Sequence, residues 1–136
     1  MIKHITRRGI APLLLVAMAI SVGLLVHPSI AKAACTDSGH AGALVPAAHV
    51  GQSVTVRVYT TTDTPVNPMS ADINRPNGTL FSAGPYNFGA KTPGGFYFAP
   101  VTFTPTTTGT WKVKYSIGMS GCSGLYTATA NVPVTT

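Results

Sequence analysis

The feature that most constrains this chain is an alternation of apolar and polar side chains with a period of two residues, repeated in several short segments. The valines of segment 52–60 fall at every second position, and segments 69–74, 111–117 and 126–134 follow the same rule. This spacing places one face of an extended strand against a core and the other in water. After residue 33, no helical spacing of apolar residues runs for long without Gly or Pro inside it. The pattern therefore predicts an all-β domain.

Turn signals divide these segments at short intervals. Residues 75–79 (Arg-Pro-Asn-Gly-Thr) fit a type I turn closed by a left-handed Gly, which is a common three-residue hairpin loop. Residues 108–109 and 121–124 mark further turns, and a short edge strand near 43–45 is expected to end at Pro46. About seven short strands separated in this way predict an antiparallel β-sandwich.

The aromatic segment 96–103 is interpreted as one of these strands. A bend is expected at Ala99 and Pro100, in its middle. With such a bend, Tyr97 points outward, and the apolar side chains on both sides of the bend face the core: Phe96, Phe98, Val101 and Phe103.

The first 33 residues have the order of a secretory signal peptide. A basic start is followed by the apolar run 10–26, and Ala31-Lys32-Ala33 places small residues at the −3 and −1 positions of a cleavage site. We therefore expect a signal peptide over 1–33 and one domain over 34–136. The apolar run lies between the length of a signal core and that of a membrane span, so a retained anchor is the alternative.

The net charge of +6 resides mostly in this leader. Cleavage after Ala33 leaves five dispersed cations against three Asp residues, with no Glu, and hence a charge of +2. A nucleic-acid partner would need clustered Lys and Arg, so none is expected. No membrane span is expected after cleavage.

One stretch resembles a known family. Residues 103–115 (Phe-Thr-Pro-Thr-Thr-Thr-Gly-Thr-Trp-Lys-Val-Lys-Tyr) are similar to the corner and strand near the end of bacterial immunoglobulin-like domains, and residues 50–56 resemble their entry into the second strand. The resemblance implies an antiparallel immunoglobulin-like β-sandwich over most of 34–136. The chain departs from antibody-type domains, because the second strand lacks Cys and the aromatic residue after the corner is Trp111.

The resemblance also implies a disulfide bond. In this fold the start of the first strand lies at the same end as the hairpin that joins the last two strands. Cys35 precedes the first strand and Cys122 lies in that hairpin, so a Cys35–Cys122 bridge is expected, in keeping with export to an oxidising compartment. A lipid-modified Cys35 is the alternative, although Lys32 stands where a lipobox carries an apolar residue.

Catalytic patterns are weak. Residues 118–122 (Gly-Met-Ser-Gly-Cys) lack the last Gly of a nucleophile elbow, and no helix is expected after them. The three Asp residues fall on unrelated segments, so no carboxylate pair is expected, and a secreted hydrolase is the least favoured function. The chain is therefore not expected to be an enzyme.

A copper site is the alternative with specific residues. His40, His49 and Met119 are the candidate ligands, and His40 and Met119 are expected at the same end of the domain. No His-x-His or Cys-x-x-Cys pattern accompanies them, so no metal or other cofactor is the main expectation. The sequon 77–79 (Asn-Gly-Thr) is explained by the hairpin turn without glycosylation.

Segment 86–98, which contains a Gly- and Pro-rich loop, is the candidate binding patch. Exposed Tyr86, Phe88 and Tyr97, with Lys91 beside them, would stack on a sugar or anchor a protein. In the alternative reading, Phe88 closes the end of the core and Tyr86 packs on a neighbouring strand. The expected function is a secreted, non-catalytic interaction module of the extracellular space or cell envelope, with a protein or glycan partner; a small periplasmic or extracellular copper-binding protein is the alternative.

Overall fold

A computed structural model describes residues 34–35, 41–61 and 63–136, all within one unit, Lys32–Thr136. The predicted signal peptide over 1–33 and the candidate ligand His40 lie outside the described residues. Within the described part of the chain every regular element is a β-strand, as the alternation predicts. In that part, no helix is long and apolar enough to cross a membrane.

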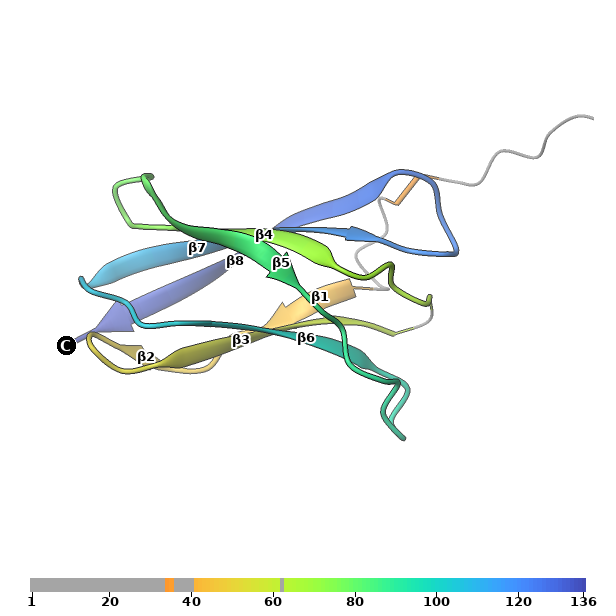
Figure 1. Ribbon diagram of the computed structural model, residues 1–136. Coiled ribbons are helices and arrows are strands. Elements are labelled where there is room, and N and C mark those ends of the chain that lie inside the picture. Colours follow the sequence, from red (N-terminus) through yellow and green to blue (C-terminus); the bar gives the residue numbers. More distant parts are fainter. Residues whose placement is uncertain (1–33, 36–40, 62) are drawn as a thin grey trace, which may run out of the picture. The chain divides into compact units, whose positions relative to one another are not determined.

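Eight strands form two sheets, which Figure 1 shows as two layers. The three-stranded sheet has the order β1-β3-β6, and the five-stranded sheet has the order β2-β8-β7-β4-β5. All neighbouring strands are antiparallel except β2 and β8. The strand bounds are β1 Ala41–Leu44, β2 Ala48–His49, β3 Val54–Thr60, β4 Met69–Asn74, β5 Leu80–Tyr86, β6 Tyr97–Phe103, β7 Gly109–Gly118 and β8 Leu125–Thr135.

Both sheets bury one face in a shared core. The valines of β3 that alternate in the sequence are at most 3% exposed, and the odd-numbered residues of β7 from Trp111 to Ile117 are equally buried. Burial of this apolar area is the main favourable term in folding, at about 25 cal/mol per Å². The period of two in the sequence thus corresponds to the inward face of each strand.

The eighth strand, β2, was not expected. It has two residues and pairs in parallel with β8, so that Ala48 lies opposite Val134. The chain leaves the three-stranded sheet at the end of β1, passes Pro46 and joins the five-stranded sheet at β2. A two-residue strand is too short for any periodicity to reveal it.

The predicted β4–β5 turn is present. Gly78 has a φ of +87°, and its N–H donates to the Arg75 carbonyl at 2.9 Å. The Asn77 side-chain oxygen accepts hydrogen bonds from the Thr79 N–H at 3.0 Å and the Thr79 hydroxyl at 2.7 Å. The side chain of the sequon is therefore engaged in shaping its own turn.

The expected bend in β6 is wrong. The strand pairs with β3 in one unbroken register, from Val54 opposite Phe103 to Thr60 opposite Tyr97. Strict alternation then directs Tyr97 toward the core and Phe98 away from it, because Ala99, Val101 and Phe103 occupy the buried face. Pro100 is accommodated at an exposed edge position without a break in the ladder.

Trp111 anchors the corner between β6 and β7. Its side chain is 0% exposed, and its indole N–H donates to the Thr107 carbonyl at 2.9 Å. Its ring packs against Phe81 and Phe103, with centroids 5.1 and 5.6 Å away. A buried indole needs such a partner, and the chain supplies it four residues upstream.

Candidate interaction surface

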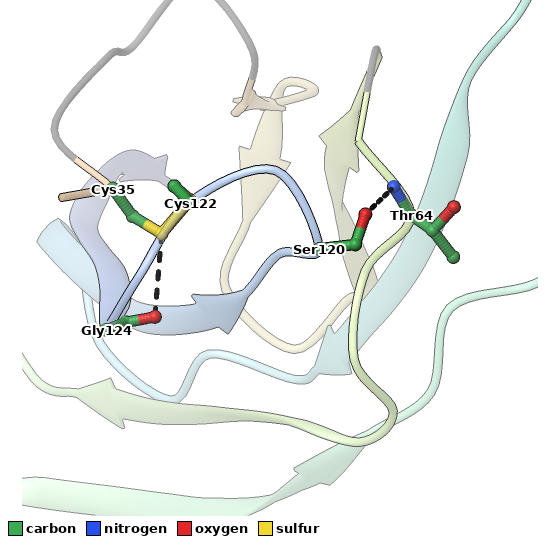
Figure 2. The surroundings of a disulfide bond; sticks show 5 residues. All are labelled: Cys35, Thr64, Ser120, Cys122 and Gly124. Atoms are coloured by element: carbon green, nitrogen blue, oxygen red, sulfur yellow. Dashed lines mark hydrogen bonds between the residues drawn. A yellow bond between two sulfur atoms is a disulfide. The ribbon is translucent and has the colours of Figure 1, made fainter. Parts of the chain in front are cut away.

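The Cys35–Cys122 disulfide is present, as the resemblance implies (Figure 2). It joins residues 87 positions apart, with their Cα atoms 5.1 Å from each other. The Cys35 N–H donates to the Ser123 carbonyl at 3.1 Å, and the Cys35 sulfur lies 3.5 Å from the Gly124 carbonyl oxygen. A sulfur engaged in this bond has no free valence for a lipid, so the two fates of Cys35 are mutually exclusive.

The β3–β4 connection runs beside the same hairpin. The Thr64 N–H donates to the Ser120 hydroxyl at 3.2 Å (Figure 2). The Ser120 N–H donates in turn to the Thr64 carbonyl at 3.0 Å. The Asp63 carboxylate occupies the space that a Cβ at Gly121 would need. Asp63 is therefore held at the disulfide end, whereas Asp72 lies on the outer face of β4.

The predicted binding patch is not an exposed aromatic surface. Phe88 is 6% exposed, and the Asn67 side chain holds its main chain by hydrogen bonds of 2.7 and 3.3 Å. Tyr86 and Tyr97 are half-buried and pack against the core. Only Lys91 is exposed, with its Nζ 5.9 Å from the Tyr97 ring centroid. The arrangement matches the alternative in which Phe88 closes the core.

The candidate copper ligands are not brought together. His49 lies on β2, where its Nδ1 is 3.0 Å from the Thr135 hydroxyl at the far end of β8. Met119 is 5% exposed, lies between the end of β7 and the start of β8, and forms an isolated β-bridge with Pro65. The length of β8 separates the two residues by about 30 Å. No group of three or more His, Cys, Asp or Glu residues in the described ranges could hold a metal ion. Copper binding through His40 stays a prediction.

The outer faces of the two sheets differ in chemistry. The outer face of the five-stranded sheet is polar on β4, β7 and β8. It is made of Ser70, Asp72, Lys112, Lys114, Ser116, Thr127, Thr129 and Asn131. Asp72 lies directly opposite Lys114 in the register, which suits a solvated surface.

The three-stranded sheet instead carries aromatic rings on its outer side, where Tyr59, Phe96 and Phe98 are half-buried against one another. Tyr59 meets Phe96 and Phe98 edge to face, at centroid distances of 5.7 and 6.3 Å, and the two Phe rings are stacked at 5.6 Å. The Arg57 guanidinium lies over the Phe98 ring, 3.9 Å from its centroid. A Cβ at Gly42 would lie 2.6 Å from the Tyr59 hydroxyl oxygen, so glycine there leaves room for the ring to lie across β1.

This surface extends onto the end of β1. Leu44 is 48% exposed beside Arg57, its partner in the register, and a shallow groove of about 400 Å³ runs between them and Pro46. We call the whole surface the aromatic face and define it by six residues: Leu44, Arg57, Tyr59, Phe96, Phe98 and Pro100.

Sequence reasoning missed the aromatic face because it assigned Phe96 and Phe98 to the core. The signal was present in the alternation itself. Counting back in twos from Phe103 reaches Ala99 and Tyr97, which leaves Phe98 on the other face, beside Tyr59.

The free edge of β6 beside this face is closed. The Gly89 N–H donates to the Phe98 carbonyl at 2.9 Å, so the main chain of Phe98 points away from β3. Pro100, two residues on, points to the same edge and has no N–H to offer.

A second apolar surface lies near the disulfide. It is a shallow groove of about 450 Å³ between the β3–β4 connection and the start of β8. Val66 and Leu125 flank it and are 57% and 62% exposed. The rest of its lining mixes apolar, small and polar residues: Pro68, Met119, Gly118, Gly124, Ser70 and Ser116.

Comparisons with known proteins add no function. No family model matches the chain, and no curated protein matches it. Among solved structures the chain is similar to a family 123 glycoside hydrolase from Clostridium perfringens, studied for glycolipid glycan hydrolysis, with a TM-score of 0.42 and 16% identity. The match covers 67% of this chain and 22% of that chain, so this chain spans about a fifth of that enzyme. A likeness at this level carries no argument.

Proposed function

We propose that residues 34–136 form an exported immunoglobulin-like domain that acts as a non-catalytic interaction module in the extracellular space or cell envelope, with a protein or glycan as its partner. The proposal joins three parts, namely fold family, export and mode of action, and each has its own support.

The strand order supports the fold family. Immunoglobulin-like domains split their strands between two antiparallel sheets with connections that cross from one to the other. Here the connections β3–β4, β5–β6 and β6–β7 each change sheet. The Trp111 hydrogen bond to Thr107 stands where antibody-type domains have a tyrosine that bonds a few residues upstream.

The disulfide supports export. Structural disulfides persist in oxidising compartments, and the pair Cys35–Cys122 is the kind of cross-link expected there. The leader-like order of residues 1–33 agrees with the same location.

The aromatic face is the observation that carries the interaction role. The outer side of this sheet carries the half-buried rings of Phe96, Phe98 and Tyr59, and so differs from the polar outer face of the other sheet. Aromatic side chains and Arg are enriched where protein surfaces bind partners. The described carboxylates, Asp63 and Asp72, lie on separate elements and do not form the paired arrangement that hydrolysis of a glycoside uses.

The test is to express the full chain in a bacterial host and follow the product. Intact mass and N-terminal sequencing of the exported fraction should give a chain that begins at Ala34 and contains the disulfide. The exported protein should then bind a solubilised envelope protein or polysaccharide saturably and leave that partner intact. Retention in the cytoplasm, or cleavage of the partner, would contradict the proposal.

A further inference from the structure

We infer that the aromatic face docks a protein segment in which one carboxylate lies among apolar side chains, with the carboxylate on Arg57. This inference rests on the proposed function and adds to it a surface and a class of partner. Four observations lead to it.

The first is the balance of residue types on the aromatic face. It combines three aromatic rings with Leu44 and Pro100, and its single charged side chain is Arg57. Protein interfaces enrich aromatic residues and Arg and deplete Lys, Asp and Glu in this way. The opposite sheet, with Lys112, Lys114 and Asp72 outside, has the composition of a surface that stays in water.

The second is the state of Arg57. Its guanidinium rests on the Phe98 ring at 3.9 Å from the centroid, and the residue is exposed. A stacked guanidinium is held in place by its flat face and keeps its N–H edge free for a carboxylate, which it binds through two parallel hydrogen bonds. In the described chain the carboxylates of Asp63 and Asp72 belong to other surfaces.

The same charge argues against a second copy of this chain as the occupant. A two-fold contact through the aromatic face would bring Arg57 toward Arg57 of the other copy with no described carboxylate between them. Like charges buried together cost free energy, whereas a partner that carries a carboxylate removes that cost.

The third observation separates a protein from a sugar. A glycan site needs polar groups for the hydroxyls of its ligand. On this sheet the Thr55 and Thr102 hydroxyls bond one another at 2.8 Å, which leaves Arg57 and the Tyr59 hydroxyl as the polar groups among the residues of the aromatic face. The aromatic face is thus suited to apolar side chains with one anion among them.

The fourth is that strand addition at β6 is blocked. The Phe98 carbonyl on that edge already accepts a hydrogen bond from the Gly89 N–H, and Pro100, the next residue whose main chain faces the edge, has no N–H to donate. On the β6 side, where the rings lie, a partner segment would therefore cross the face of the sheet, and its side chains, more than its main chain, would supply the contacts.

The probe is a displayed library of random peptides of about twelve residues, selected on the exported wild-type protein and counter-selected on an Arg57→Gln variant. Enriched peptides should combine Asp or Glu with aliphatic or aromatic residues. By fluorescence anisotropy, their affinity should fall at least about tenfold in Arg57→Gln, since a carboxylate that loses its partner on binding is left desolvated. Lys114→Gln is the matched control, because it removes the same charge from the polar face, and it should change affinity less than about twofold.

A second readout needs no variant. Amide chemical-shift changes on adding an enriched peptide to the wild-type protein should centre on β3 and β6 near Tyr59 and Phe98. Shifts confined to the groove at Val66 and Leu125 would overturn the inference and leave the interaction role intact. No enrichment of peptides, combined with Arg57-dependent binding of polygalacturonate, would overturn the protein partner in favour of an acidic glycan. Failure of the proposed function shows separately, in the export and partner-cleavage measurements above.

Discussion

At the scale of single residues, Trp111 is the largest fully buried side chain of the described chain. It is the one Trp of the chain, and both its ring and its N–H are buried with partners. We expect Trp111→Phe to lower the free energy of unfolding by about 2–4 kcal/mol, because it removes a hydrogen bond and leaves a cavity beside Phe81 and Phe103. Urea unfolding followed by far-ultraviolet circular dichroism measures the change without relying on Trp fluorescence.

The control for this prediction uses the acceptor. The indole bonds the main-chain carbonyl of Thr107, so Thr107→Ala keeps that carbonyl. Its unfolding free energy should stay within about 0.5 kcal/mol of the wild type. Equal losses in the two variants would show that the hydrogen bond is not what holds the corner.

Tyr115 gives the molecule a stability limit in alkali. Burial, with smaller contributions from Tyr126 and Tyr59, raises the pKa of Tyr115 from 10.0 to about 12. The folded protein keeps a proton that the unfolded chain releases, so this contribution is complete below pH 10 and is lost as the pH rises toward about 12. The shift corresponds to about 2–3 kcal/mol.

The measurement compares urea unfolding at about pH 9 and about pH 11.5, first in the wild type and then in Tyr115→Phe. The wild type should lose more stability between the two pH values than the variant, which has no phenol at this position. If the two proteins lose the same amount, other groups cause the alkaline loss.

At the scale of elements, the edge of β6 is protected by Pro100. One edge of the five-stranded sheet, β5, also has a Pro at an outward position, Pro85, opposite Ser70. Proline at a free edge withholds the N–H that a second chain would need for pairing. These prolines thus protect one edge of each sheet, at β6 and at β5, from pairing with a second chain.

We expect Pro100→Thr to promote self-association, because it restores an edge donor next to the exposed Thr102. Sedimentation velocity over a range of concentrations should show oligomers in the variant and not in the wild type. Pro93→Thr is the matched control, since Pro93 lies in a turn of the β5–β6 connection. Oligomers in the control, or none in Pro100→Thr, would contradict the role of the edge proline.

Strand prediction from the sequence was accurate where one alternation ran without competition. In β3 and in β7 only one set of alternating apolar residues was available to face the core, and the structure buries that set in each strand. In β6 two incompatible sets of apolar residues, 96 and 98 against 101 and 103, competed for one face. The register with β3 settles that competition, and the pairing of one strand with another is not visible in a single segment.

The candidate surface was predictable only in part for the same reason. The sequence gathers aromatic residues in segment 86–98, but their exposure depends on which neighbours cover them. Phe88 is buried in the core, and its main chain is hydrogen-bonded by the Asn67 side chain, which is 21 residues away in the sequence. Contacts of this range follow from the assembled fold.

At the scale of the whole molecule, the disulfide holds the N-terminal part of the described chain to the β7–β8 hairpin. We expect Cys35→Ser with Cys122→Ser to lower the free energy of unfolding by about 3–5 kcal/mol, since the bond closes a long loop in the unfolded chain. Guanidinium unfolding of the oxidised wild type, the reduced wild type and the double variant measures this. The last two should agree, and a double variant as stable as the oxidised protein would contradict the prediction.

The same cross-link determines how tension travels through the domain. A pull between Cys35 and the C-terminal residue Thr136 enters the hairpin directly at Cys122, so β1 to β7 lie inside a closed loop and bear none of the load along the chain. Peeling β8 away then lengthens the tether to roughly 50 Å, whereas the reduced chain would extend to roughly 340 Å. The reach of this domain under force is therefore governed by the redox state of one bond and not by the number of its strands.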